Sequence, residues 1–485
     1  MRLCWLIVLA ALSMAHVGSP DAFFTGKAGP YDVRVTVRLP GVIPGRAQVA
    51  VRLVGASAAA NPQVTLQAAQ WNVGLTGAPP PEPAVAVPGS PDLYAAELWL
   101  MTASSYQLAV HVTGAAGSGT AIVPVMAIAT AERPMAPWLG WALAGLGLFL
   151  TVGFMTIIGS AVRESVLPPG VEPDSRRRTR ARIGIAVAAL VAGLLLWGGN
   201  VWWAAEASGY SRNVLYRPFA AEAQATAPGG KPQLTLAIRD PRWTGMPNPA
   251  SRYNALLPDH GKLMHLFLVR EPSLEAFAHL HPTPRSPAAL DFDTGLPALP
   301  AGRYRVYGDI VHESGYAQTL VSNVEIHNSG GSQPTDPDDS WFSGTAVEAG
   351  TSASFDLGDG LRVVWDRGAS ALVAGEEVVL TFSVRDATGA PVTVEPYMGM
   401  AAHAIVASRD GSVFAHLHPS GSISMAALQK FTATTPTVDH AAHDATLESA
   451  VAIPFAFPRS GAYRIWVQVK RSGKVMTAAF QADVS

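Results

Sequence analysis

The sequence predicts a mainly β protein with three immunoglobulin-like antiparallel β-sandwich domains and a two-helix transmembrane hairpin. Short alternating apolar runs separated by turn residues fill most of the chain, a pattern typical of sandwiches. Two long stretches without charge interrupt these runs, and the C-terminal half contains a duplicated pattern. The 485 residues are 49% hydrophobic and 14% charged, which is apolar for a soluble protein and indicates a membrane part. A net charge of −2 without a basic patch excludes nucleic-acid binding.

Residues 1–15 are expected to form a signal peptide, because one arginine, a short apolar stretch and small residues at Ser13 and Ala15 follow that pattern. Cleavage after Ala15 would leave His16 at the mature N-terminus, where its amine and ring could chelate copper. Cleavage a few residues away would leave an ordinary terminus. The single cysteine, Cys4, lies within the signal, so the exported chain is expected to contain no disulfide.

Residues 16–133 are expected to form the N-terminal β-sandwich, because alternating runs such as 33–39 and 47–54 recur between turn residues. This domain lacks a histidine pair. His111 stands alone in an expected strand, where a half-buried sheet residue is the simpler interpretation than a metal ligand.

Residues 137–162 and 183–203 are each long and apolar enough to cross about 30 Å of hydrocarbon. The expected loop between them, 163–182, contains six arginines and three acidic residues. The positive-inside rule therefore predicts a cytoplasmic loop, with both large parts of the chain outside the cytoplasmic membrane of a bacterium.

The duplicated pattern predicts two further sandwiches, at 214–328 and 340–485, joined by a flexible polar linker at 329–339. Each contains the phrase Phe-Ala-His-Leu-His-Pro, preceded by a strand that begins with histidine. The second also has a longer loop with His440 and His443, either an additional surface ligand pair or a solvated loop.

Hairpin geometry brings the histidines of each copy together. The Asp410-Gly411 turn pairs Ile405 with His416 and His403 with His418, and a five-residue loop at 271–275 places His265 opposite His281. Side chains alternate across a strand, so Met264 faces away from His265. The candidate metal ligands are His403, His416, His418, Met398 and Met400 in the second copy, and His260, His265, His279 and His281 in the first.

These residue types indicate copper, with zinc as the alternative, because imidazole suits both metals and thioether sulfur suits copper(I). One ion is expected in each repeat, with the Met-containing second repeat favouring copper(I). The alternative is that no metal binds and the histidines are rim residues, since Phe414 and Ile405 share their face. No enzyme activity is expected, because no carboxylate lies within either motif and no nucleophile elbow or phosphate loop is present.

The Met-Gly-Met-Ala-Ala-His and Phe-Ala-His-Leu-His-Pro stretches, with the closing Gly-X-Tyr-Arg strand, resemble the exported immunoglobulin-like domains of the YtkA-like and FixH-like group. That group is similar in architecture to CopC-like periplasmic copper carriers. The resemblance covers the two C-terminal units and implies a β-sandwich fold with a link to copper handling or oxidase assembly.

Two functions follow as expectations. The first is a membrane-anchored periplasmic protein that binds copper for buffering, transfer or resistance, with a copper donor or acceptor as its partner. The second is a periplasmic scaffold or assembly factor for a membrane complex such as an oxidase, in which the histidines are structural.

Overall fold

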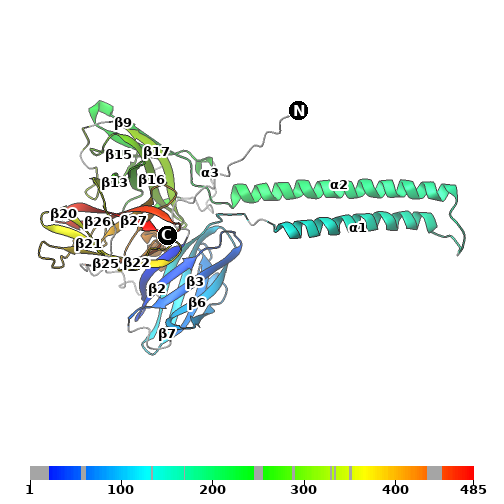
Figure 1. Ribbon diagram of the computed structural model, residues 1–485, viewed down its shortest axis with the longest axis horizontal. Helices are drawn as coiled ribbons and strands as arrows, with labels where there is room; N and C mark the ends of the chain where they lie inside the picture. Colours follow the sequence, from blue (N-terminus) through cyan, green and yellow to red (C-terminus); the bar gives the residue numbers. More distant parts are fainter. Residues whose placement is uncertain are drawn as a thin grey trace. The chain divides into compact units, whose positions relative to one another are not determined.

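The computed structural model describes residues 21–55, 62–132, 135–168, 170–244, 255–286, 290–327, 330–332, 335–348, 352–433 and 450–485. The chain divides into two compact units, one formed by residues 1–128 with 216–485 and the other by residues 129–215. The fold is mainly β, as predicted, with antiparallel sheets in the first unit and two long helices in the second (Figure 1).

The N-terminal domain is one curved eight-stranded sheet in the order β1-β2-β3-β6-β5-β4-β7-β8, and β1 also contacts β8. Alternation builds its core, because Tyr31, Val33, Val35 and Val37 of β2 are buried between more exposed neighbours. The strands are β1 (Ala22–Ala28), β2 (Tyr31–Arg38), β3 (Gly45–Leu53), β4 (Gln63–Gln70), β5 (Glu82–Val87), β6 (Ser90–Leu100), β7 (Ser104–Gly114) and β8 (Gly117–Ala127).

The first repeat is a sandwich of two sheets. One has the order β14-β15-β10-β9, and the other has the order β11-β16-β12-β13-β18, with β17 paired to β16. Leu234, Leu266 and Val306 lie in the core between the sheets. The strands are β9 (Ala221–Thr226), β10 (Gln233–Ile238), β11 (Leu256–Leu257), β12 (His265–Arg270), β13 (Ala276–Leu280), β14 (Thr283–Pro284), β15 (Asp291–Gly295), β16 (Gly302–His312), β17 (Ala317–Ile326) and β18 (Ser340–Ser343).

The second repeat has the same plan, with sheets β20-β21-β22-β25 and β19-β27-β26-β23-β24 around Trp365, Val406 and Phe480. Its elements are β19 (Val347–Glu348), β20 (Ser352–Gly358), β21 (Leu361–Asp366), β22 (Glu377–Arg385), β23 (His403–Ser408), β24 (Phe414–Leu417), α4 (Met425–Ala433), β25 (Ala450–Ala456), β26 (Gly461–Arg471) and β27 (Lys474–Val484). The helix α4 follows directly on the second histidine motif.

The expected boundary between the repeats needs correction. β18, at the start of the expected second repeat, pairs with β13 and completes a sheet of the first repeat. Residues 335–339 of the expected flexible linker are anchored, because the Asp339 carboxylate accepts hydrogen bonds from the backbone of Thr335, Asp336 and His281. A buried carboxylate with several donors holds its loop in place.

The two repeats pack against each other through the sheet faces that point away from their own cores. β12 places Leu266 and Leu268 in its own sandwich and Phe267 in the contact with the second repeat. The contact is a separate apolar cluster in which Phe277 stacks on Trp466 at 4.7 Å between ring centroids, and Tyr307 stacks on Phe414 at 4.0 Å. Both of these sheets are therefore buried on two faces.

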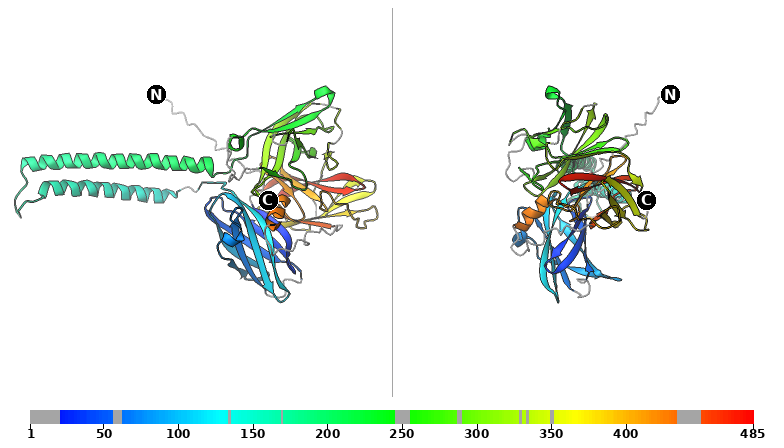
Figure 2. Two further views of the ribbon diagram at one scale, coloured as in Figure 1. Left: turned by 180° about the vertical axis from the view of Figure 1, so that it is seen from behind. Right: turned by 90° about the vertical axis from the view of Figure 1, so that its left-hand side faces the viewer.

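The N-terminal domain also contacts the second repeat. The backbone nitrogen of Thr25 donates to the carbonyl of Ser420, and Phe24 bridges to Gly421. Gly421 has φ +113°, and a Cβ there would lie 2.0 Å from the carbonyl oxygen of Phe23, so only glycine fits this approach. The helix α4 packs on β8 (Figure 2).

The second unit contains two helices long and apolar enough to cross a membrane, α1 (Pro137–Glu164) and α2 (Ser175–Asn213). They lie side by side, and Gly159 of α1 faces Ile185 of α2 so closely that a Cβ would lie 2.7 Å from it. The expected loop 163–182 is shorter than predicted, because Asp174 caps α2 and its arginines form the first turns of that helix. At about 58 Å, α2 is also longer than a bilayer core.

Candidate metal centre

Seven of the 13 histidines in the sequence meet at one end of the contact between the repeats. Rings from different repeats approach about as closely as facing rings of one repeat: His265 and His416 lie 5.3 Å apart between centroids, and His403 and His416 lie 5.4 Å apart. The seven, all buried or nearly so, are His260, His265, His279, His281, His403, His416 and His418.

These rings point into the contact between the repeats because side chains alternate between the two faces of a strand. In β13 and β24, Phe277 and Phe414 join the apolar cluster between the repeats, and the histidines two and four residues later continue on the same face. In β12 and β23, the histidine is the first residue of the strand. The apolar cluster therefore ends in a group of imidazoles.

One group that could hold a metal ion combines residues from both repeats: His260, His403 and His418 have ligand atoms within 4.8 Å of one another. The ring of His260 hydrogen-bonds to the Met398 backbone, and Nδ1 of His418 lies 3.3 Å from the carbonyl oxygen of Ile423. The rings of His260 and His418 thus each have one nitrogen engaged by a carbonyl and Nε2 left for an ion, the arrangement common for metal-binding histidines.

The second group, His265, His279 and His281, comes from the first repeat alone. His281 Nδ1 donates to the Asp339 carboxylate at 3.1 Å. His279 Nδ1 donates to Oε1 of Gln468 at 2.8 Å and lies 3.2 Å from the hydroxyl of Tyr397, which itself donates to the Asp338 carbonyl. These acceptors fix the proton on Nδ1 and leave Nε2 as a bare lone pair.

His265 creates a conflict that a cation would resolve. Its Nε2 lies 3.2 Å from the carbonyl of Asp259 and its Nδ1 lies 3.1 Å from Nε2 of His279, so the single N–H of the neutral ring can donate to one of these neighbours and not to both. An ion bound to Nδ1 of His265 and Nε2 of His279 would leave the N–H on Nε2 for the Asp259 carbonyl.

Other ring nitrogens of the centre have no hydrogen-bond partner among the residues that the structure describes. They are Nε2 of His260, His281, His416 and His418 and both nitrogens of His403. A buried polar atom without a partner costs about 1–3 kcal/mol, so a purely structural cluster would carry a large penalty. This donor set fits a metal that prefers imidazole.

Burial keeps most of these imidazoles neutral. Desolvation, reinforced by the neighbouring histidines, lowers the pKa of His265, His279, His403 and His418 well below the usual value. Desolvation also lowers the pKa of His260, against the opposing charge of Asp259. Neutral imidazole is the form that binds metal, so the lone pairs are available at neutral pH.

Carboxylates surround the imidazoles. Asp309 lies 3.4 Å from Nδ1 of His416, and Asp259 lies 3.8 Å from Nε2 of His260. Asp336 and Asp339 also form a possible metal-binding group with His281.

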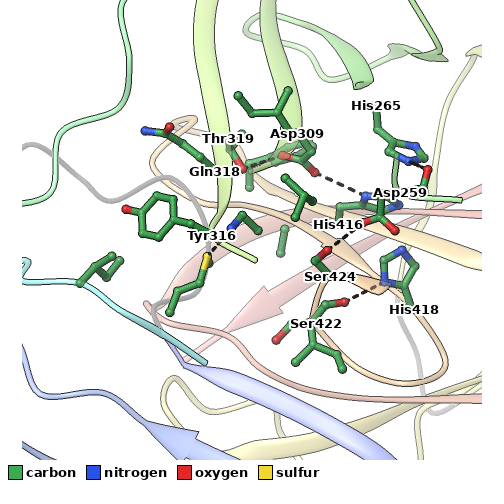
Figure 3. A pocket seen from close by; sticks show the side chains of 18 of the residues that line it. Asp259, His265, Asp309, Tyr316, Gln318, Thr319, His416, His418, Ser422 and Ser424 are labelled. Carbon is green, nitrogen blue, oxygen red and sulfur yellow. Dashed lines mark hydrogen bonds and ion pairs between the residues drawn. The ribbon is translucent and has the colours of Figure 1, made fainter. Parts of the chain in front are cut away.

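A cavity of about 120 Å³ leads to the centre (Figure 3). His265, His416 and His418 lie on one side of it, together with Asp259 and Asp309. Met126 and Ile128 line another part. The centre is therefore buried from bulk solvent but accessible to a small ligand.

The predicted hairpin pairings are confirmed. Ile405 pairs with His416 in β23 and β24, and the Leu266–Leu280 pair brings His265 opposite His281. Met264 points into its own core, as predicted. The expectation of one ion in each repeat stays a prediction: His265, His279 and His281 form a group within the first repeat, whereas His260 of the first repeat joins His403 and His418 in the place that was expected for His416.

Met398 and Met400 lie in a tight turn closed by backbone hydrogen bonds between Tyr397 and Met400. This turn places the Met398 backbone at His260, while the role of the two sulfurs as copper(I) ligands stays a prediction. His111 is half-buried and bonds to Thr120, in keeping with a sheet residue. His16, His440 and His443 lie outside the described residues, as does the expected signal peptide.

Sequence reasoning missed the residues that orient the rings, namely Gln468, Tyr397 and the aspartates at 259, 309 and 339. The Asp259-His260 dipeptide and the acidic run before β18 were the available signals. No sequence pattern pointed to Gln468, because only the packing of the second repeat on the first brings β26 to His279.

A family model described as a domain of unknown function (DUF8832) matches residues 219–327 and 354–485, which correspond to the two repeats. No curated protein matches the chain.

Among solved structures, a tetra-tandem repeat from the extending region of a large adhesion protein is 9% identical, with 93% of this chain and 74% of that one covered and a TM-score of 0.15. The FN1–FN3 domains of chicken CNTN1 are 10% identical, with coverage of 92% and 97% and a TM-score of 0.14. A putative membrane anchored protein from Corynebacterium diphtheriae is 10% identical, with coverage of 96% of both chains and a TM-score of 0.15.

Proposed function

We propose that this chain is a membrane-anchored protein that binds copper at the seven-histidine centre and buffers or transfers the ion outside the cytoplasmic membrane of a bacterium. The observation that supports the proposal best is the convergence of buried imidazole lone pairs from both repeats, with the opposite ring nitrogens of most of them bonded to carbonyl or carboxylate acceptors. A metal ion would satisfy these nitrogens together.

The choice of copper rests on ligand chemistry. Imidazole suits copper and zinc, and at equal ligands copper(II) binds more tightly than zinc. Calcium and magnesium prefer oxygen ligands, whereas the groups that converge in this centre are mainly imidazoles. The resemblance of the two motifs to YtkA-like and FixH-like domains agrees with a role in copper handling.

The two apolar helices support membrane anchoring. The arginines at the start of α2 favour a cytoplasmic position for the connection between the helices, which would put both β regions on the other side of the membrane. A buried centre with a narrow cavity suits storage or handover of an ion to a partner, rather than turnover of a large substrate.

A scaffold for a membrane complex is the second candidate function. The observation in its favour is the well-packed aromatic contact between the repeats, which needs no metal to form. In that case the histidines would be structural.

Metal binding by the full chain tests the proposal. Protein purified in detergent, stripped with a chelator and titrated with copper(II), copper(I) or zinc(II) should bind copper more tightly than zinc. The double variant His403→Ala/His418→Ala, which loses two of the three histidines of one group, should bind less copper than the wild type, and His111→Ala, outside the centre, should bind the same amount. Unchanged copper binding in the double variant would favour the scaffold.

A further inference from the structure

We propose that the centre holds two metal ions side by side, one in each histidine triad, with a coordination position open to the cavity. The proposal rests on the proposed function and specifies its site. The first triad is His260, His403 and His418, and the second is His265, His279 and His281.

Each triad needs its own ion. In the first, His403 has no partner for either ring nitrogen among the described residues, and Nε2 of His260 and His418 are equally unpaired. In the second, Nδ1 of His265 and Nε2 of His279 lie 3.1 Å apart, and Nε2 of His281 has no partner among the described residues, so a cation would bind all three nitrogens. One ion in either triad leaves the other conflict unresolved.

The two ions would be close neighbours. Across the triads, the ring centroids of His260 and His265 lie 6.1 Å apart, and those of His279 and His403 lie 6.4 Å apart. Within the first triad, the corresponding distances are 5.0–5.4 Å. The spacing between triads is thus little larger than the spacing within one, so ions bound in the two triads would be neighbours.

His416 lies between the triads. Its ring centroid is 5.6 Å from His279 of the second triad and 5.4 Å from His403 of the first. Its Nδ1 faces Asp309 at 3.4 Å, and its Nε2 lacks a hydrogen bond within the described part of the chain. This imidazole is available to either ion as an additional ligand.

The local charge also favours two ions. The carboxylates and ammonium groups around the imidazoles sum to −3, which one divalent cation does not neutralise. They are Asp259, Asp309, Asp336, Asp338 and Asp339, with Lys262 and Lys470 paired to Asp336 and Asp338.

Three imidazoles per ion leave a fourth position free, as in open metal sites. His265, His416 and His418 line the cavity and so direct that position toward it. At about 120 Å³, the cavity admits a small anion or a few waters and is smaller than pockets for drug-sized ligands, which are roughly 300–1,000 Å³. Azide is a suitable probe.

The test uses two matched variants of the full chain in detergent, His418→Asn and His281→Asn. The amide nitrogen of asparagine occupies the position of Nδ1, so it can retain the bond to Ile423 or Asp339 while the Nε2 ligand is removed. Wild-type protein should bind two copper(II) ions, and each variant should bind one. His111→Asn is the control and should bind two.

Electron paramagnetic resonance of the same samples tests proximity. Two neighbouring copper(II) ions couple through their magnetic dipoles, so the wild-type signal should be broadened and accompanied by a half-field transition, and each variant should give the signal of an isolated copper(II) ion. Azide should shift the absorption of the loaded wild type.

One ion per wild-type chain, or two ions with the uncoupled signal of isolated copper(II), would overturn the two-ion proposal while leaving copper binding intact. No bound copper would overturn both. Two ions retained in either asparagine variant would contradict the assignment of ions to these triads.

Discussion

At the scale of single residues, the centre depends on which ring nitrogen carries the proton. Gln468 and Tyr397 hold that proton on Nδ1 of His279, and Asp339 does the same for His281. None of these side chains belongs to either metal-binding triad. They act as positioning residues, because they orient the rings that would bind the ions.

Replacing Gln468 tests this role. Gln468→Met keeps an unbranched side chain of similar size but removes the acceptor for His279, so copper affinity should fall by roughly 10–100-fold. Competition with a chelator measures the loss. Gln107→Met, which replaces a similarly buried glutamine of β7, is the control and should bind copper as the wild type does. Equal affinities would show that Gln468 does not position His279.

The lowered pKa values make the metal-free protein sensitive to acid. His265, His279, His403 and His418 stay neutral in the folded state, whereas in the unfolded chain they gain protons below a pKa of about 6.5. Each histidine with a lowered pKa therefore leaves the free energy of unfolding unchanged above pH 7. Below pH 6.5 it lowers that free energy, because only the unfolded chain takes up the proton. The melting temperature of the metal-free protein should be flat from pH 8 to 7 and then decrease. A constant value down to pH 5 would contradict the neutral state of the cluster.

At the scale of elements, the strands and hairpins were predictable because their signals are local. Alternation and turn residues gave the register of β23 with β24 and of β12 with β13. The helix ends were less predictable, since the arginines after Asp174 are compatible with either a loop or a helical extension, and α2 extends to Asn213.

The docking of the repeats was not predicted, because each motif was interpreted within its own sandwich. A signal was present: Leu266 to Val269 and Ala404 to Ala407 are continuous apolar runs instead of alternating ones. Such runs indicate strands buried on both faces. What the runs do not specify is the partner sheet, which depends on long-range packing of Phe277 on Trp466 and of Tyr307 on Phe414.

This contact should matter for metal binding. Phe414→Ala removes the ring that stacks on Tyr307, two residues from His416, at a cost of about 3–5 kcal/mol. Because the contact aligns the histidines of the two repeats, copper affinity should fall as well. Phe382→Ala, in the core of the second sandwich, should lower the melting temperature similarly and affect copper affinity less. Similar copper affinities in the two variants would show that copper binding does not depend on the contact between the repeats.

At the scale of the whole molecule, two antiparallel apolar helices place the chain segments before α1 and after α2 on the same side of any membrane they cross. From the arginines at the start of α2, the positive-inside rule predicts that the opposite side is the cytoplasm. The chain would then present both β regions outside.

Cysteine labelling tests this topology cleanly, because Cys4 is the only cysteine in the sequence. In a Cys4→Ser background, Val85→Cys on exposed β5 should react with a membrane-impermeant maleimide in intact spheroplasts. Val166→Cys, in the connection between the helices, should react only after the membrane is disrupted. Labelling of Val166→Cys in intact spheroplasts would show that the connection lies outside and would contradict the predicted orientation.

The central claim is that the histidines are buried for a metal ion and not for the stability of the fold. The most direct measurement is the melting temperature of His403→Leu with and without copper. Leucine replaces a buried ring that lacks hydrogen-bond partners in the described chain with an apolar side chain of similar volume. Without metal, the melting temperature of the variant should equal that of the wild type or exceed it by up to about 4 °C. Copper should raise the melting temperature of the variant less than that of the wild type. A lower melting temperature without metal, together with an undiminished increase on adding copper, would contradict the account.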